Sequence, residues 1–548
     1  MSDYTPSVDV SPKESEKLQQ IHSKGFVGKL SSYARLTGPG WLQAAVTLGG
    51  GSLASALYLG VISGYSLMWL QPLAMLCGVI MLMALAHVTL GNKKYPFTSV
   101  KETISPVLAW SWLGATVVAD VVFCAAQASL GVAAVQQNLG ININAYIITI
   151  ILSAIGLASA ALYALGSNAV KQLEFILKIL VGIVIVCFAA AAVTLLFSGK
   201  VNLGAIFAGL IPNPMALFKP ATSLDAMIAA TGPSADYWNN YVTDLQRSRI
   251  IAAFGTAVGI NMTFLLPYTL VKRGWGKVHR ELSRFDLVIA LFLPFSLATG
   301  LLVICAASSF HGQTTDVLDS NGRPVPSLEA GYYKILNQRL VAEGDLPVDP
   351  AATREMANQL PLAERELAAA LTNRDAKQLS NTLAPIMGQG MADLVFGVGI
   401  LAMALSTMMV HMLMNGFAIS QSVGKPGKFK PFVIGASMPA LLAIFAPFVW
   451  SGDAKAALQI PAAVIATTLL PIAYLAILLL MNSRKTLQDG ERASPIVNIL
   501  MVISAGIATF ASFWLLSHKG TAGMIGIAGL ILLALTGVFG FWRHKRKA

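Results

Sequence analysis

The sequence predicts an all-α, polytopic membrane protein with about 12 transmembrane helices of about 20 residues each. Of its 548 residues, 55% are hydrophobic and only 12% are charged, whereas soluble proteins carry roughly 25% charged residues. The apolar residues fall into separate runs that are long enough to cross a bilayer as helices. In chain order, the predicted spans cover residues 38–62, 66–90, 107–134, 143–166, 173–197, 252–272, 286–308, 390–415, 431–450, 459–482, 496–517 and 520–542.

The placement of charge supports this fold class and gives an orientation. The net charge is +12, and the loops near Ser63, Asn138 and Ser451 carry almost no basic residues. Basic residues cluster instead at Lys93-Lys94, Lys171, Lys272-Arg273, Lys425 to Lys430, Arg484-Lys485 and Arg543 to Lys547. This is the positive-inside pattern. We therefore expect both termini in the cytoplasm, a bacterial plasma (inner) membrane as the location, and the lipid bilayer rather than nucleic acid as the partner.

Three segments follow from the order of the spans. We expect residues 1–36 to form a cytoplasmic tail, since they are polar and lack the apolar region of a cleaved signal peptide. Residues 37–485 hold ten spans and two inserts, about 198–250 and 309–389, on the outer side. The second insert is rich in helix formers and predicts a helical cap. Residues 486–548 hold two additional transmembrane helices and a basic cytoplasmic C-terminus.

The first span contains a break. The segment Gly49-Gly50-Gly51-Ser52 lies in a run from Gly38 to about Leu90 without any Asp, Glu, Lys or Arg. Three glycines should interrupt a helix there, and unpaired backbone groups in a membrane are tolerated where they line a cavity or are buried in protein. We interpret this break as half of a binding site, with room for more than a bare ion.

The sixth span supplies the matching break, at Gly255 to Asn261 with Pro267 beyond it. A GxxxG pair such as Gly255 and Gly259 more often indicates close helix packing. Breaks in corresponding spans of two five-span halves are, however, typical of inverted-repeat transporters, whose broken helices face the substrate. A rival break at Thr231 to Ser234 lies too far from the seventh span and is too polar, so we interpret it as an interfacial or outer-vestibule segment.

Several motifs resemble one family. Gly38-Pro39-Gly40-Trp41, the triple glycine and Gly64 to Trp69 are similar, without a gap, to the GPGF-like, DPGN and GYSLLW motifs of NRAMP metal transporters. Further matches are Ala119-Asp120, Phe310-His311-Gly312 and Asn482-Ser483-Arg484-Lys485. The resemblance covers spans one to ten. It implies the LeuT-like fold, a 5+5 inverted repeat with discontinuous helices 1 and 6, and transport by alternating access.

The family's metal ligands are missing from the matching positions. The DPGN aspartate falls on Gly49 and its asparagine on Ser52. The sixth-helix Met-Pro-His falls on Gly259-Ile260-Asn261, the backbone-carbonyl position on Thr256, and the second histidine on Leu266. In the third span the aspartate persists as Asp120, while the glutamate is Phe123. The resemblance therefore does not carry over a soft, carboxylate-bearing site for manganese or iron, although one branch of the family transports magnesium through an altered site.

The residues left at the two breaks are the candidate substrate-binding residues. They offer hydroxyls, an amide and freed carbonyls, and we assign no metal ligand among them. The set is Gly49, Gly50, Gly51, Ser52, Thr256, Gly259 and Asn261, with Gln43 and Thr47 nearby. Mg²⁺ keeps several waters and prefers oxygen ligands, so it could pass such a site partly hydrated. A small organic or zwitterionic solute would fit the half-helix dipoles equally well.

Asp120 is the one acid placed deep in the first ten spans. An intramembrane acid is costly and is by default a functional hypothesis. Together with Gln127, seven residues on, it is a candidate for coupling or proton relay; the alternative is a structural hydrogen bond.

The remaining chemistry-bearing residues are interpreted as packing. The eighth span contains Met403, Met408, Met409, His411, Met412 and Met414, which could ligate soft metals but are ordinary fillers of apolar helices. We read His87 and the four buried cysteines in the same way. No nucleophile–base pair or cofactor motif occurs, so we expect neither an enzyme nor a bound cofactor.

These inferences lead to a secondary transporter of the NRAMP-like type that moves a Mg²⁺-like, partly hydrated divalent cation. The alternatives are a transporter of a small non-metal organic solute and a non-transporting membrane sensor or scaffold with an NRAMP-like body.

Overall fold

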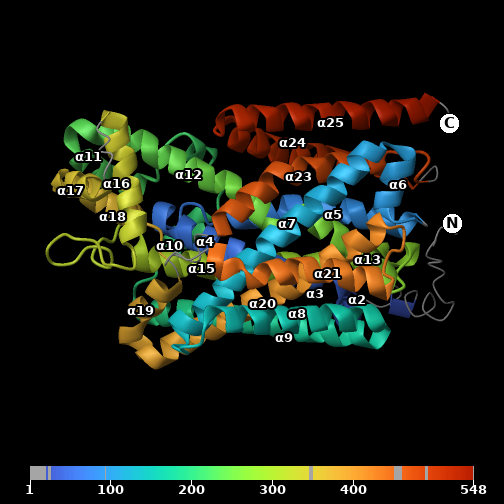
Figure 1. The fold of residues 1–548 in the computed structure, drawn as a ribbon, viewed down its shortest axis with the longest axis horizontal. Helices are drawn as coiled ribbons and strands as arrows, with labels where there is room; N and C mark the ends of the chain where they lie inside the picture. Colours follow the sequence, from blue (N-terminus) through green and yellow to red (C-terminus); the bar gives the residue numbers. More distant parts are fainter. Residues whose placement is uncertain are drawn as a thin grey trace.

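The computed structural model describes residues 20–21, 26–92, 94–344, 350–374, 376–449, 459–487 and 491–546. Within these ranges the regular structure is helical, and extended pairing is limited to one isolated bridge between Leu318 and Pro324. The all-α prediction is confirmed (Figure 1).

The described residues include ten helices that are long and apolar enough to span a membrane, and up to eleven if one bent pair counts as a span. The single helices and their continuations are α5 (Leu70–Gly91), α7 (Pro106–Ala133) with η1 (Ala134–Asn138), α8 (Ala145–Leu165), α9 (Ser167–Phe197), α14 (Arg280–Asp286) with η6 (Leu287–Phe292) and α15 (Leu293–Phe310), α20 (Gln389–Ser422), α21 (Phe429–Ile444) with α22 (Ala446–Val449), α23 (Gln459–Met481), α24 (Pro495–Ser517) and α25 (Gly520–Arg546). The predicted spans outside the two breaks are thus confirmed as helices.

The first break is shorter than the glycine run. Helices α3 (Pro39–Thr47) and α4 (Gly50–Ser63) meet at Leu48 and Gly49 with a bend of 53°. Gly50, Gly51 and Ser52 already belong to the first turn of α4. The predicted discontinuous first helix is confirmed.

The sixth helix is also discontinuous, but it starts earlier than expected. Helix α12 (Ala235–Ala257) ends before Val258, and α13 (Met262–Lys272) begins after Asn261. The predicted start at residue 252 is wrong, because α12 runs without interruption from Ala235. Its polar first half contacts the inserts instead of lipid, so an apolarity criterion does not detect it.

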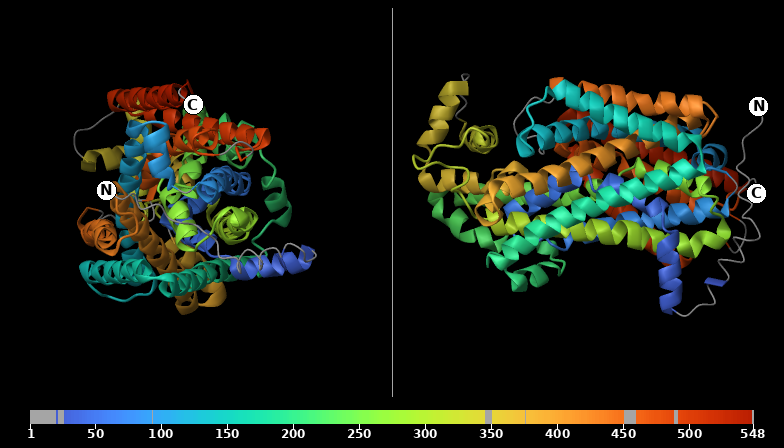
Figure 2. Two further views of the ribbon diagram at one scale, coloured as in Figure 1. Left: turned by 90° about the vertical axis from the view of Figure 1, so that its right-hand side faces the viewer. Right: turned by 90° about the horizontal axis from the view of Figure 1, so that it is seen from below.

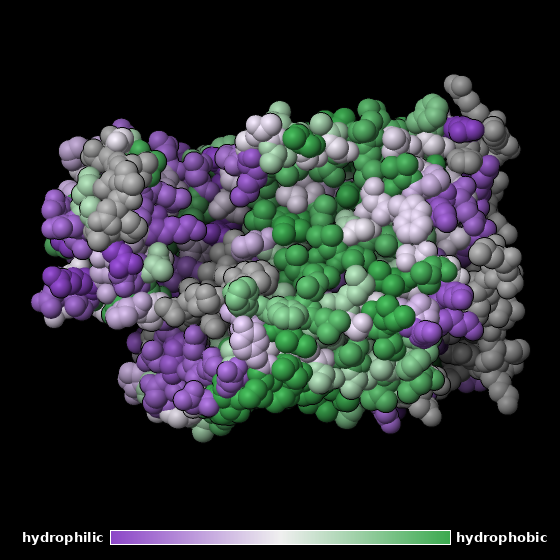
Figure 3. All heavy atoms as spheres, in the orientation of Figure 1, coloured by the Kyte–Doolittle hydropathy of each residue, from purple (hydrophilic) through white to green (hydrophobic). Residues whose placement is uncertain are grey.

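The inserts are helical and lie at the end of the bundle opposite the termini. The first holds α10 (Leu203–Gly209), η2 (Pro214–Leu217), η3 (Thr222–Leu224), α11 (Asp225–Ala230) and η4 (Gly232–Ser234). The second holds α16 (Glu329–Glu343), α17 (Pro350–Gln359), α18 (Leu362–Leu371) and α19 (Ala376–Met387), as expected for a helical cap. Figure 3 shows this end as hydrophilic and the middle of the bundle as a broad hydrophobic belt.

Two short helices lie at the other end. Helix α2 (Phe26–Leu36) runs across the bundle axis (Figure 2), as an interfacial helix would, and α6 (Pro96–Thr103) packs on α7. The C-terminal end of α25 lies at the same end (Figure 1).

Helix α20 is at the centre of the packing. It contacts α7, α8, α9 and α21, while α4 packs on α15 and α12. Helices α24 and α25 pack on α23 at one edge of the bundle. Residues of the two breaks lie around one cavity inside the bundle.

Candidate functional site

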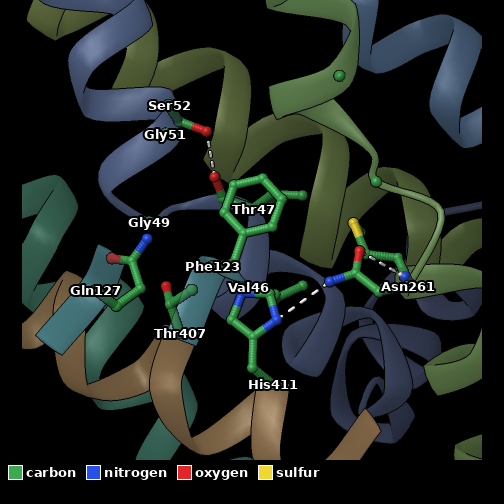
Figure 4. A pocket seen from close by; sticks show the side chains of 13 residues that line it. Val46, Thr47, Gly49, Gly51, Ser52, Phe123, Gln127, Asn261, Thr407 and His411 are labelled. Atoms are coloured by element: carbon green, nitrogen blue, oxygen red, sulfur yellow. Dashed lines mark hydrogen bonds between the residues drawn. The ribbon is translucent and has the colours of Figure 1, made fainter. Parts of the chain in front are cut away.

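A small cavity lies where the two broken helices meet (Figure 4). Its volume is about 30 Å³, which is room for about two water-sized spheres. The wall is formed from both breaks and from α7 and α20, by Val46, Thr47, Gly49, Gly51, Ser52, Phe123, Gln127, Gly255, Gly259, Asn261, Met262, Thr407 and His411.

The backbone groups freed by the first break are satisfied by neighbouring helices. The amide of Gly50 donates to Gln127 Oε1 at 2.9 Å, and Gln127 Nε2 donates to Gln459 Oε1 of α23 at 3.0 Å. Thr407 Oγ1 of α20 donates to the carbonyl of Ala45 at 3.0 Å. Polar side chains from α7, α20 and α23 thus stabilise an interruption that would otherwise be costly in a membrane.

The glycines at this break permit close packing. A Cβ on Gly49 would lie 2.7 Å from Thr407 Oγ1, and one on Gly50 would lie 2.6 Å from the side-chain carbonyl carbon of Gln459. Neighbouring side chains therefore fill the space beside Gly49 and Gly50, and the room for a substrate is limited to the small cavity that Gly49 and Gly51 line.

The second break brings three polar side chains together. Asn261 Nδ2 lies 3.0 Å from Asp120 Oδ1 and 3.1 Å from His411 Nδ1, and His411 Nδ1 lies 3.0 Å from Asp120 Oδ1. All three side chains are buried. The contact between the imidazole nitrogen and the carboxylate oxygen requires a proton between them, carried by His411 Nδ1 or by Asp120. The cluster holds a proton that can be released when Asp120 is protonated or the imidazole is cationic. Asp120 Oδ2 has no hydrogen-bond partner within the described structure.

Phe123 covers this cluster. Its ring stacks on the His411 imidazole, with 5.4 Å between the centroids and 6° between the planes. Phe123 also lines the cavity, together with Val46, Thr47 and His411 (Figure 4). An apolar ring therefore covers one face of the His411 imidazole.

Comparison with known proteins decides the family. The sequence profile described as Nramp, natural resistance-associated macrophage protein-like, matches residues 40–323 and 365–518. The chain belongs to the Nramp family. The expected membership is confirmed, and the protein is a membrane transporter of this family, which fits the expectation that it is not an enzyme.

Solved structures give the same fold. A manganese transporter from Eremococcus coleocola, in complex with an aromatic bis-isothiourea substituted compound, is 16% identical, with 99% of each chain covered and a TM-score of 0.59. A mutant of that transporter is 15% identical, with 95% of this chain and 97% of the other covered and a TM-score of 0.57. At these identities the likeness concerns the fold, which is LeuT-like, with discontinuous helices 1 and 6. No curated protein matches the sequence.

Most of the candidate residues of this Nramp protein come together at the cavity. Its wall includes Gly49, Gly51, Ser52, Gly259 and Asn261. Gly50 lies behind them through its bond to Gln127. Thr256 belongs to α12, but its side chain lies outside the described residues. Asp120 and Gln127 have separate surroundings: Asp120 contacts the second break and Gln127 the first.

Four residues at the site were not singled out as ligands from the sequence. His411 was interpreted as packing, and Thr407, Met262 and Gln459 were not considered. Thr407 and His411 are four residues apart in an apolar helix and so share one face. That spacing was the sequence signal that could have placed Thr407 and His411 at the site. No local feature of the sequence marks Gln459 as part of it.

The donor set is poor in the ligands that transition metals prefer. In the described part of the chain, no group of three or more His, Cys, Asp or Glu side chains is placed to hold a metal ion. The four cysteines are free and lie away from the cavity wall. Hydroxyl and amide groups dominate, with Asp120 nearby and with Met262 and His411 as the softer donors.

Proposed function

We propose that this Nramp-family transporter moves a Mg²⁺-like divalent cation, partly hydrated, by alternating access through the cavity at the two breaks. The observation that carries the proposal is the composition of the wall. Thr47, Ser52 and Thr407 offer hydroxyl oxygens, and Gln127 and Asn261 offer amides. Mg²⁺ favours such oxygen donors and retains several waters.

The size of the cavity supports a small ion. About 30 Å³ holds an ion with few waters, since one water needs about 10–15 Å³. A cavity of this size is small for an organic solute, so we rank that alternative below the cation.

The Asp120–His411–Asn261 cluster is our candidate for coupling. In the form in which Asp120 is protonated, a cation arriving near it would favour release of the carboxyl proton by charge repulsion. We expect Asp120→Asn to abolish the pH dependence of transport. Proton-coupled uptake that persists in Asp120→Asn would contradict this assignment.

A softer metal is a second candidate, favoured by Met262 and His411 on the cavity wall. Thioether and imidazole donors select copper, iron or zinc over Mg²⁺. Only two such donors are present, and His411 is already bonded to Asp120 and Asn261. We therefore rank this candidate below the hard cation.

The orientation is part of the proposal. We propose that α2 and the C-terminal end of α25 face the cytoplasm of a bacterial plasma membrane and that the inserts face outward. The shared end of these two helices and the basic clusters near it support this orientation.

Flux in liposomes tests the proposal. The purified protein is reconstituted, and uptake of Mg²⁺, Mn²⁺ and Ca²⁺ is titrated with ion-selective dyes. We expect saturable Mg²⁺ uptake that falls at least about tenfold in Thr407→Val and Gln127→Leu, because each removes a polar group from the wall. Ser437→Ala, at a half-buried position of α21 away from the cavity wall, is the control. Mn²⁺ uptake that saturates at micromolar concentration would contradict the interpretation that the family's metal ligands are missing, and absence of any divalent flux would support an organic solute or a sensor.

A further inference from the structure

Residues 324–364 are an addition to the family fold, because the Nramp profile leaves them unmatched. They contain α16, α17 and the start of α18, and they lie at the end of the bundle away from the termini, beside the outer end of α12 (Figure 1). Buried polar contacts fasten them there.

Glu364 is the centre of these contacts. Its buried carboxylate accepts hydrogen bonds from Ser234 Oγ at 2.9 Å, Trp238 Nε1 at 2.8 Å and Arg339 Nε at 2.7 Å. Arg339 also donates to Ser234 Oγ at 2.7 Å. Charge-assisted bonds of this kind are strong, and removing one partner of a buried pair leaves an uncompensated charge. One buried group thus joins α16 and α18 to the start of α12.

Helix α12 connects this contact to the transport site. It is continuous from Ala235 to Ala257, and Gly255 near its other end lines the cavity. The part of α18 that follows the added residues also reaches α4, since Tyr58 Oη donates to the carbonyl of Leu371 at 3.4 Å. The Arg249 guanidinium of α12 stacks on the Tyr58 ring at 4.4 Å. Both half-helices on this side of the cavity are therefore tied to the insert.

The C-terminal flank of the insert is anchored elsewhere in the bundle. The buried guanidinium of Arg374 bonds to Asp316 at 2.9 Å and to the carbonyl of Gln313 at 2.8 Å, and it lies over the Phe310 ring at the end of α15. Helix α19, which follows, packs on α9 and α20. The insert thus bridges the half-helices α4 and α12 and the helices behind the cavity.

We propose that residues 324–364, together with the following segment through Arg374 and α19, act as a clamp that holds α12 and α4 in place and limits how often the cavity opens toward the insert side. Alternating access moves one part of such a transporter against the other around a fixed site. A buried link between those parts stabilises one arrangement, so weakening it shifts the population toward opening. This inference rests on the transporter fold and is independent of which ion is carried.

Thiol labelling of the cavity tests the clamp. Ser52→Cys is placed in a chain whose four cysteines are replaced by Ala, and a membrane-impermeant maleimide is applied from the insert side. We expect Glu364→Ala to accelerate labelling roughly tenfold, within the range typical of coupling between two states. Glu366→Ala is the matched control, because it removes an exposed carboxylate from the same helix.

A milder variant tests the clamp in case Glu364→Ala does not fold. Tyr241→Phe removes the 2.8 Å bond from Tyr241 Oη to Gln338 Oε1 and keeps the ring; combined with Ser234→Ala, it should accelerate labelling to a smaller extent. Unchanged labelling in both variants relative to Glu366→Ala would overturn the clamp. Because labelling requires no substrate, failure here is distinct from failure of the proposed ion.

Discussion

Gly50 shows how single residues define the site. Its amide is bonded to Gln127, and the space where its side chain would lie is occupied by Gln459 and Leu130. A helix break was predictable from the glycine run, but the reason for glycine is tertiary packing against α7 and α23.

Gly50→Ala should destabilise the protein. The added Cβ would lie 2.6 Å from Gln459 and 2.7 Å from Leu130, and overpacking of this kind costs about 1–3 kcal/mol. Gly182→Ala in α9 is the control, since no atom lies within 4 Å of its Cβ position. It should be neutral or stabilising by up to about 1 kcal/mol. Thermal unfolding measures both; equal melting temperatures would contradict the packing.

His311 predicts a pH dependence of stability. It follows α15, and its Nδ1 lies 2.8 Å from the carbonyl of Val61 while Nε2 lies 2.6 Å from Ser223 Oγ. Burial lowers the pKa of His311 below its usual value, so the neutral form stabilises the fold. That stability is complete above the unfolded pKa of about 6.5 and is lost as pH falls through the lower folded pKa. The melting temperature should therefore drop more between pH 7.5 and 5.5 in the natural protein than in His311→Gln. Parallel curves would refute this.

The site residues were partly predictable for a physical reason. Gly49, Ser52 and Asn261 lie at breaks that leave a trace in local sequence. His411 and Thr407 come from an unbroken apolar helix, and only the packing of α20 against α3 and α7 brings them to the cavity. A methionine-rich helix gives no local sign of that approach.

At the scale of elements, each half-helix depends on neighbours for its ends. The first amides of α3 have no partner within the helix, as at any N-terminus. Asp286 of α14 supplies one: its carboxylate accepts from Gly38 N at 3.0 Å and from Gly40 N at 2.6 Å. The position of α3 is thus fixed by the seventh span.

Asp286→Ala should be strongly destabilising, because it leaves two buried amides without acceptors at about 1–3 kcal/mol each. Asp286→Asn keeps one acceptor oxygen and should lose less. Thermal unfolding of the two variants gives the comparison, with Asp225→Ala, on the exposed start of α11, as control. If Asp286→Asn is as destabilising as Asp286→Ala, the negative charge of Asp286 matters more than its role as acceptor for the two amides.

Stacked aromatic rings gather around α13, the helix that follows the second break. Tyr268 of α13 stacks on Tyr95 at 4.3 Å and on Phe417 of α20 at 4.8 Å between centroids. Tyr268→Ala should open a route from the end that holds the termini and accelerate maleimide labelling of Ser52→Cys from that side. Tyr146→Ala, at an exposed start of α8, should leave the rate unchanged. Equal rates in both variants would show that the stack does not seal the cavity.

The extent of α12 shows why element boundaries were less predictable. Its second half was detected by apolarity, whereas its first half is polar and buries groups such as Trp238 against the insert. Apolarity does not detect a helix segment that packs against polar parts of the protein.

At the scale of the molecule, an Nramp body is combined with an altered site and an added clamp. The body was predictable because apolar spans, helix breaks and family motifs can each be recognised in a short stretch of sequence. We propose that the few groups at the breaks decide the ion, because Gly49 and Gly259 stand where the family resemblance implies metal ligands.

The most direct test restores those ligands and measures Mn²⁺ binding by calorimetry. Gly49→Asp is combined with Thr407→Ala, which removes the atoms within 3 Å of the new Cβ, and with Gly259→Met; Thr407→Ala alone is the control. If the site is correctly located, the triple variant should bind Mn²⁺ at least about tenfold more tightly than the natural protein, a change of about 1.4 kcal/mol. Tight Mn²⁺ binding by the natural protein, or no gain in a folded triple variant, would contradict the account.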